Sequence, residues 1–354
     1  MSNGFRKFLQ SVSLAAVVVF AAGAASAQTL AYVSDDFLGV AVIDTATNTF
    51  VANVPVDAGG SLTAAPNGAF VYVSNATDTV SVIAAATNTV VATIAIPQPV
   101  QIAFTPDSAF AYVTSTALNR DNVAEVYVID VAKHKVVDTI PLDQGLSGVA
   151  VTPDGAFVWV ASPETNETYV VDTATNTLAA TVGFGGNSLA FTPDGAFAYL
   201  TSAPDSTVSV VSTATHTLVA GIPGVTGLDI AITPDGDFAY VPEPFSGDVA
   251  VIDTATNTVT TTVPIIGTPA FVAITPDGAF AYVVDPAGVV YVIDTATNTV
   301  ADSVTGGFAL GGIDILVKPA SPTTKAQCLN GGWATFSNPS FANQGSCISY
   351  VNGL

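Results

Sequence analysis

Carboxylates are the most numerous ionisable groups in this 354-residue sequence, since 28 Asp and Glu stand against 7 Lys and Arg and 2 His. Carboxylate pairs can act as general acid and base, and their oxygens suit Ca²⁺. Many of them, however, recur in two turn motifs, Asp-Thr-Ala-Thr-Asn-Thr and Thr-Pro-Asp-Gly, where Asp can hydrogen-bond its own turn. We therefore assign a structural role to Asp44, Asp130, Asp172, Asp253, Asp294, Asp107, Asp154, Asp194, Asp235 and Asp277.

The two histidines do not suggest a catalytic or metal site. His134 and His216 take the place that Asn fills in other copies of the Asp-Thr-Ala-Thr-Asn-Thr turn. We expect this position to need a positive φ angle, which Asn, Asp and His tolerate best. His-based triads, copper clusters and most zinc sites are therefore not indicated. We predict no cofactor and no metal site, with Ca²⁺ as an alternative at the carboxylates.

The turn motifs belong to a repeat that must position all of these residues. The Asp-Thr-Ala-Thr-Asn-Thr motif and its variants occur seven times, at spacings of 40 to 46 residues. Four short β-type runs separate successive copies, which is typical of a propeller blade. The chain begins with a second strand and ends with a first strand. The sequence therefore predicts an all-β, seven-bladed β-propeller of four-stranded antiparallel blades, closed by three N-terminal strands (31–54) and one C-terminal strand (313–317).

The second strands carry a resemblance to a known family. They read Tyr112-Val-Thr-Ser, Tyr72-Val-Ser-Asn, Tyr32-Val-Ser-Asp and Tyr199-Leu-Thr-Ser, each between a Pro-Asp-Gly-type turn and a copy of the Asp-Thr-Ala-Thr-Asn turn or its variant. Over about residues 30–318 the chain resembles the YVTN-repeat family of secreted bacterial and archaeal propellers. The resemblance implies a surface or periplasmic protein, often of a kind without known activity.

The N-terminus has the pattern of a secretory signal. Arg6 and Lys7 precede an apolar run, and Ala25-Ser26-Ala27 offers a cleavage site before Gln28. We expect residues 1–27 to be removed and the protein to be exported to the periplasm, the cell surface or the extracellular space. The remaining chain has 5 Lys and Arg against 28 Asp and Glu, a net charge of −23. Such a charge disfavours nucleic acid and favours a monomer; we expect no membrane span.

The C-terminus is predicted to be a separate small module. Residues 28–318 form the propeller, 319–325 a linker and 326–354 the module, which holds the only two cysteines. In an exported protein, Cys328 and Cys347 should form a disulfide. The segment resembles a short Cys-containing tail found on many secreted bacterial proteins, and its role is left open.

One face of the propeller collects the loops that vary between blades. In an up-and-down blade, the second-to-third-strand loops and the blade linkers share a face opposite the repeated turns. Variable loops on a rigid scaffold often carry binding residues. The predicted binding face consists of Asp35, Asp36, Asp78, Arg120, Asp121, Glu125, Glu164, Glu167, Asp205, Glu243, Phe245, Asp248 and Asp285, with Asp57 and Asp143 on linkers.

The first strands, which line the channel of a propeller, are almost wholly apolar. Gln101, Asp229 and Asp314 are the polar exceptions. We therefore expect a non-catalytic binding or scaffold protein of the cell envelope, with a protein or surface polymer as its partner. The alternatives are a propeller enzyme of the lactonase or quinone-dependent dehydrogenase type, which would use charged residues around the channel, and a structural component of a surface layer.

Overall fold

The computed structural model describes residues 27–35, 38–57, 60–118, 123–306, 310–319 and 344–352. The chain divides into one compact unit of residues 27–319 and a second of residues 1–26 and 320–354. In the second unit the described part is helix α2 (Gln344–Asn352), which carries the buried Cys347. Cys328 lies outside the described residues, so its disulfide with Cys347 stays a prediction. Among the described residues, no helix is long and apolar enough to cross a membrane.

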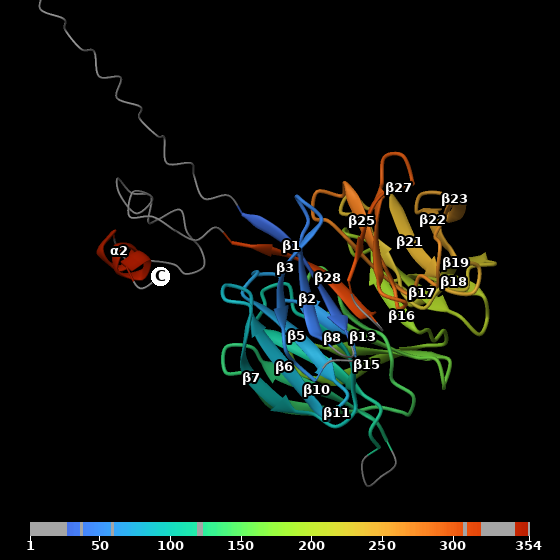
Figure 1. The fold of residues 1–354 in the computed structure, drawn as a ribbon. Coiled ribbons are helices and arrows are strands. Elements are labelled where there is room, and N and C mark those ends of the chain that lie inside the picture. Colours follow the sequence, from blue (N-terminus) through green and yellow to red (C-terminus); the bar gives the residue numbers. More distant parts are fainter. Residues whose placement is uncertain are drawn as a thin grey trace, which may run out of the picture. The chain divides into compact units, whose positions relative to one another are not determined.

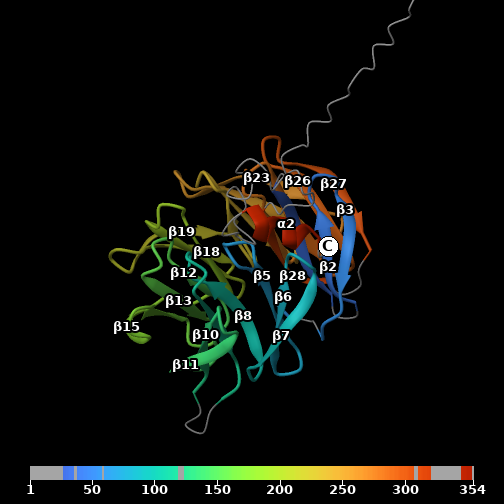
Figure 2. The ribbon, with the colours of Figure 1, turned by 90° about the vertical axis from the view of Figure 1, so that its left-hand side faces the viewer.

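Residues 27–319 form seven four-stranded antiparallel sheets, which confirms the predicted seven-bladed propeller. Figures 1 and 2 show the sheets following one another in chain order, from blue through green and yellow to orange. Blade 1 contains β28 (Leu310–Lys318), β1 (Gln28–Asp35), β2 (Gly39–Asp44) and β3 (Thr49–Val54). Blade 2 contains β4 (Leu62–Ala64), β5 (Phe70–Asn75), β6 (Thr79–Ala84) and β7 (Thr89–Ala95). Blade 3 contains β8 (Pro99–Phe104), β9 (Phe110–Ser115), β10 (Glu125–Asp130) and β11 (Lys135–Pro141).

The other four blades repeat this arrangement. Blade 4 contains β12 (Val149–Val151), β13 (Phe157–Ser162), β14 (Glu167–Asp172) and β15 (Thr177–Val182). Blade 5 contains β16 (Ser188–Phe191), β17 (Phe197–Ser202), β18 (Thr207–Ser212) and β19 (Thr217–Pro223). Blade 6 contains β20 (Ala231–Ile232), β21 (Phe238–Glu243), β22 (Asp248–Asp253) and β23 (Thr258–Pro264). Blade 7 contains β24 (Phe271–Ile274), β25 (Phe280–Asp285), β26 (Val289–Asp294) and β27 (Thr299–Thr305).

Blade 1 closes the ring as the sequence predicts. The C-terminal strand β28 pairs with β1 in antiparallel register, with Leu30 opposite Leu316 and Ala31 opposite Ile315. Figure 1 shows the red-orange β28 beside the blue β1. Pairing the two ends of the propeller leaves neither with an open inner edge, and an open edge would be a site for aggregation.

The repeated turns have the geometry that their residues require. In Thr-Pro-Asp-Gly turns the Thr hydroxyl donates to the Asp carboxylate, as from Thr105 Oγ1 to Asp107 Oδ1 at 2.6 Å. This hydrogen bond lowers the pKa of Asp107. The Asn position of the other turn has a positive φ in all seven copies, including 50° at His134 and 56° at His216, which confirms the predicted turn role of the histidines.

These turn residues also fasten each blade to the next. In six blades a second-strand Tyr hydroxyl reaches the Asn or His at the positive-φ position of the following blade, at 2.5 to 2.9 Å. In blade 4, Trp159 replaces the Tyr and packs edge-on against His216, with ring centroids 5.5 Å apart. We call these seven contacts the latch ring. They pair Tyr32–Asn88, Tyr72–His134, Tyr112–Asn176, Trp159–His216, Tyr199–Asn257, Tyr240–Asn298 and Tyr282–Asn48.

Candidate active site in the central cavity

A cavity of about 290 Å³ lies where the innermost strands of all seven blades converge. Its walls come from β4, β8, β12, β16, β20, β24 and β28, or from the residues just before those strands. These strands are short and mostly apolar. Apart from Thr63, the polar residues of the cavity wall come from five blades, all at one place in the repeat. That place is four residues before the first residue of the turn that follows the innermost strand. This first turn residue is Thr in five blades, Ala in blade 2 and Lys in blade 1.

This position forms a ring around the cavity, which we call the channel ring. Because every blade repeats the same register, residues at one repeat position lie at the same level of the propeller. Unlike the latch ring, the channel ring differs from blade to blade. In blade order its members are Asp314, Ser61, Gln101, Gly148, Ser188, Asp229 and Phe271. All except Gly148 line the cavity.

Asp229 bridges three blades. Its Oδ1 accepts a hydrogen bond from the Ser188 hydroxyl of blade 5 at 2.9 Å, and its Oδ2 accepts one from the Val272 N–H of blade 7 at 3.0 Å. Burial raises the pKa of Asp229, and these hydrogen bonds oppose that rise without cancelling it. The N–H of Ile230 also donates to this carboxylate, so three of its roughly four lone-pair sites are taken and one remains for a proton from a molecule in the cavity.

Asp314 stands two blades further along the ring. Its Oδ2 accepts the N–H of Ala64 in blade 2 at 2.8 Å, and its Oδ1 accepts the N–H of Ile315 at 2.7 Å. Burial raises the pKa of Asp314 to about 6, and the negative charge of Asp229 adds to the rise. The two carboxyl groups repel each other when both are ionised, so loss of a proton from one makes the other harder to ionise.

Gln101 makes the same kind of contact without a charge. Its Oε1 accepts the N–H of Val149 in blade 4 at 3.3 Å. All three predicted channel residues therefore accept a backbone N–H from the next blade. The two carboxyl groups differ from Gln101 because their proton affinity is raised within a cavity. Two carboxyl groups that ionise in sequence can divide the roles of base and acid.

The predicted binding face divides into buried and exposed residues. Asp35, Glu243 and Asp285 end second strands and are at most 6% exposed. Glu243 Oε1 accepts the N–H of Thr226 at 2.9 Å, and Asp285 Oδ1 accepts the N–H of Ala287 at 2.9 Å. Asp35 Oδ1 accepts the N–H of Leu38 at 2.9 Å. These three carboxylates hold loops in place within the blades and do not stand out from the surface.

The remaining residues of that face are spread around the rim. Asp78, Glu164 and Asp205 are exposed, Glu125, Glu167 and Asp248 are half-buried, and Phe245 is 81% exposed. Asp36, Arg120 and Asp121 lie outside the described residues. Within the described ranges, no three His, Cys, Asp or Glu side chains come together closely enough to hold a metal ion. The structure therefore brings together the channel residues but not the loop carboxylates.

Sequence reasoning missed the serines of the channel ring. Ser188 donates to Asp229, and Ser61 lines the same cavity. Their signal was available, because aligning the position before each first strand puts them in register with Asp229 and Asp314. We treated the first strands as apolar segments and compared only their cores, so this polar ring was not recognised.

A comparison with family models matches part of this chain. A family model described as lactonase, 7-bladed beta-propeller, matches residues 149–304, a stretch that contains Asp229. No curated protein matches the sequence. The match covers under half of the chain, and the YVTN-repeat resemblance stays a prediction.

Solved structures of low sequence identity share the fold. A functionally unknown protein from Desulfotomaculum acetoxidans DSM 771 is similar with a TM-score of 0.70 at 20% identity, covering 81% of this chain and 99% of that one. Kuenenia stuttgartiensis hydrazine synthase gives 0.62 at 22% identity, covering 72% and 89%. The dihydro-heme d1 dehydrogenase NirN gives 0.60 at 19% identity, covering 78% and 64%.

These findings overturn our expectation of a non-catalytic binding or scaffold propeller. That expectation rested on the lack of a recognisable triad and on the apolar first strands. The lactonase match favours the alternative of a propeller enzyme. The physical reason for the error is that a seven-fold fold can assemble a site from single residues of separate blades, which leaves no compact motif in the sequence.

Proposed function

We propose that the protein hydrolyses a lactone in its central cavity. The observation that carries the proposal is the pair of cavity-lining carboxyl groups, Asp229 and Asp314, whose pKa values are both raised by burial. Perturbed carboxyl groups within a cavity are typical of catalytic acids and bases. The lactonase match over residues 149–304 supports this reaction over that of a quinone-dependent dehydrogenase.

Asp229 is the general base of the proposed reaction. In its ionised form it can take a proton from a water molecule as the water oxygen attacks the lactone carbonyl carbon. The hydrogen bonds from Ser188 and Val272 hold its carboxylate in one orientation. Fixing the base in this way removes the entropy cost of positioning it during the reaction.

Asp314 is the general acid. Its pKa of about 6 keeps part of the population protonated near neutral pH, and this proton goes to the ring oxygen as the acyl carbon–oxygen bond breaks. The product is an open-chain hydroxy acid. Transfer of a proton from Asp229 back to Asp314, through solvent, restores the starting state. The product carboxylate is repelled by a chain with a net charge of −21, which favours its release.

The cavity restricts the substrate to a small lactone. Its volume of about 290 Å³ is at the lower end for small-molecule sites, which begin at roughly 300 Å³. The side chains of Leu189, Ile230 and Val272 line the apolar part of the wall. We also retain export through residues 1–27 and the Cys328–Cys347 disulfide as parts of the proposal. An extracellular or periplasmic lactonase would act on lactones that reach the cell from outside.

The test is hydrolysis of five- and six-membered lactones, followed by acid release at constant pH. Asp229→Asn and Asp314→Asn should each lower kcat by about 100-fold or more, the usual contribution of general acid–base catalysis. Asp237→Asn is the matched control, because Asp237 lies in the same blade as Asp229 but is exposed at the opposite turn. Hydrolysis that survives both channel variants unchanged, or no hydrolysis by the unmodified protein, would contradict the proposal.

A further inference from the structure

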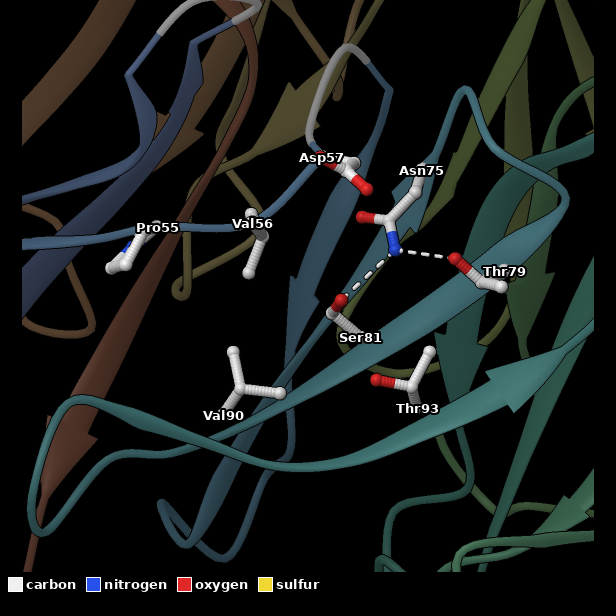
Figure 3. Close-up of a pocket in the computed structure, with 8 residues that line it drawn as sticks. All are labelled: Pro55, Val56, Asp57, Asn75, Thr79, Ser81, Val90 and Thr93. Carbon is white, nitrogen blue, oxygen red and sulfur yellow. Dashed lines mark hydrogen bonds between the residues drawn. The ribbon is translucent and has the colours of Figure 1, made fainter.

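Blade 2 has a second cavity, of about 370 Å³, far from the innermost strands (Figure 3). Its walls are the linker residues 55–57 that enter the blade, Asn75 at the end of β5, Ser81 on β6, and Val90 and Thr93 on the outermost strand β7. The proposed lactone reaction uses none of these residues.

The pocket lies at a repeat position that carries a Tyr in three blades and a small residue in the other four. The third residue of the third strand is Tyr127, Tyr169 and Tyr291 in blades 3, 4 and 7. Each is paired with a small polar residue of the fourth strand, as Tyr291 is with Ser303. In blade 2 this position is Ser81, paired with Thr93. The space that a phenol ring fills in blades 3, 4 and 7 is therefore open in blade 2.

Blades 3, 4 and 7, which carry the Tyr, show how far a Tyr ring at the position of Ser81 would reach. In blade 7, the Tyr291 hydroxyl donates to the carbonyl oxygen of Ile266 at 2.5 Å. Ile266 lies three residues after Val263, the last buried residue of β23. Asp57 lies three residues after Val54, the last buried residue of β3, and so has the same position in the linker that enters blade 2. In blade 4 the same position is Asp143, whose negative charge raises the pKa of Tyr169. The phenol hydroxyl thus comes close to this linker position.

An unpartnered acceptor faces the open space in blade 2. Asn75 is 4% exposed, and its Nδ2 donates to the hydroxyls of Thr79 and Ser81 at 2.8 and 2.9 Å. Its Oδ1 is buried without any hydrogen-bond partner. Figure 3 shows this oxygen and the carboxylate of Asp57 on the same side of the pocket. The buried Asn75 Oδ1 calls for an occupant that supplies a donor.

In blades 3 and 4, the side chain at the position of Asn75 forms a hydrogen bond within the protein. Ser115 Oγ donates to the carbonyl of Pro97 at 2.6 Å, and Ser162 Oγ donates to that of Gln144 at 2.8 Å. Both carbonyls belong to the linker that enters the blade. This pocket differs from the equivalent places in blades 3 and 4 in two ways. Blade 2 lacks the Tyr ring, and it carries the longer side chain of Asn75, whose Oδ1 has no hydrogen-bond partner.

We propose that this pocket binds a small phenol. The ring takes the place of the Tyr ring of blades 3, 4 and 7, against the aliphatic side chains of Val56 and Val90. The hydroxyl donates its one hydrogen bond to Asn75 Oδ1. A cavity left by a missing side chain readily takes a molecule of the same shape.

Titration of the purified full chain with 4-methylphenol, which is the Tyr side chain in free form, tests the proposal. Toluene has the same ring without the donor, so 4-methylphenol should bind about tenfold more tightly, the ratio expected for one hydrogen bond. Asn75→Ser, which introduces the residue of blades 3 to 5, should bring the two affinities together. No binding of 4-methylphenol, or equal binding of toluene to the unmodified protein, would overturn the proposal.

A second variant tests the location. Ser81→Tyr should restore the repeat side chain, fill the pocket and lower the affinity for 4-methylphenol by at least about tenfold. The control is Ser209→Tyr, the same substitution at the equivalent position of blade 5, which should leave the affinity unchanged. Thermal melts of both variants establish that they are folded. Binding that persists in folded Ser81→Tyr would contradict the assigned site.

Discussion

The latch ring and the channel ring are both built from one residue per blade, yet they behave in opposite ways. The latch ring repeats the same polar contact in six blades and replaces it by one aromatic contact in the seventh. The channel ring holds Asp, Ser, Gln, Gly and Phe. Both rings connect neighbouring blades, so contact between blades alone does not explain the variety of the channel ring.

The difference lies in what each ring faces. Latch side chains such as Tyr240 are fully buried between blades, where a change of shape or polarity is costly. Channel side chains face a cavity, so each blade can carry a different group without disturbing the packing. The cost there is electrostatic, since burial raises the pKa of Asp229 and Asp314. The latch ring therefore stabilises the fold, and the channel ring can take on a function.

Removing a latch side chain should have the largest effect on stability. Tyr240→Ala is expected to lower the free energy of unfolding by about 3–5 kcal/mol, the usual loss for a fully buried aromatic ring. Chemical denaturation at pH 7 measures this loss. Phe271→Ala in the channel ring, which is half-buried beside the cavity, serves as the comparison and should lose less. Equal losses would mean that the two rings do not differ in structural role.

A channel carboxyl should change how stability depends on pH. The pKa of Asp314 is about 6 in the folded protein and lies above its ordinary value of 3.8. Between these values the folded state binds more protons than the unfolded state, so stability should fall as pH rises from about 4 to 6. Asp314→Asn should reduce this fall, to which Asp229 also contributes, and gain about 1–3 kcal/mol at pH 7 relative to the unmodified protein. Denaturation at pH 4.5 and pH 7 measures the gain, and identical pH dependence in both proteins would refute the raised pKa.

Removing only the latch hydroxyl should have the smallest effect. The Tyr240 hydroxyl donates to Asn298 Oδ1 at 2.7 Å, and burial raises its pKa to about 12, so it remains a donor at all ordinary pH values. Tyr240→Phe should cost about 1 kcal/mol, the net value of one hydrogen bond. Thermal or chemical denaturation can resolve this loss. A loss as large as that of Tyr240→Ala would show that the hydroxyl, and not the ring, dominates the latch.

The repeat made the fold predictable from the sequence. Seven copies of a turn motif, with β-type runs between them, were enough to derive the blade count and the closure of blade 1 by β28. The positive φ angles at His134 and His216 followed from their alignment with Asn. These features depend on local backbone preferences, which the sequence records in every copy.

The candidate site was predictable only in part. Asp229, Asp314 and Gln101 were identified because they interrupt apolar strands, but their joint position around one cavity needs the three-dimensional ring. Burial of Asp35, Glu243 and Asp285 was not foreseen, since a loop carboxylate in sequence gives no sign of the backbone N–H groups that will surround it. The pocket of blade 2 depends on an absent side chain at Ser81, which becomes visible only when strand registers are compared.

The pH dependence of lactone hydrolysis tests the central claim most directly, namely that the varied channel ring is an active site. With Asp229 as base and Asp314 as acid, kcat should fall as pH rises through about 6, because Asp314 loses the proton that it donates. In Asp314→Asn the remaining slow hydrolysis should lack this fall. A rate that rises with pH through the same range, or an unchanged profile in Asp314→Asn, would contradict the account.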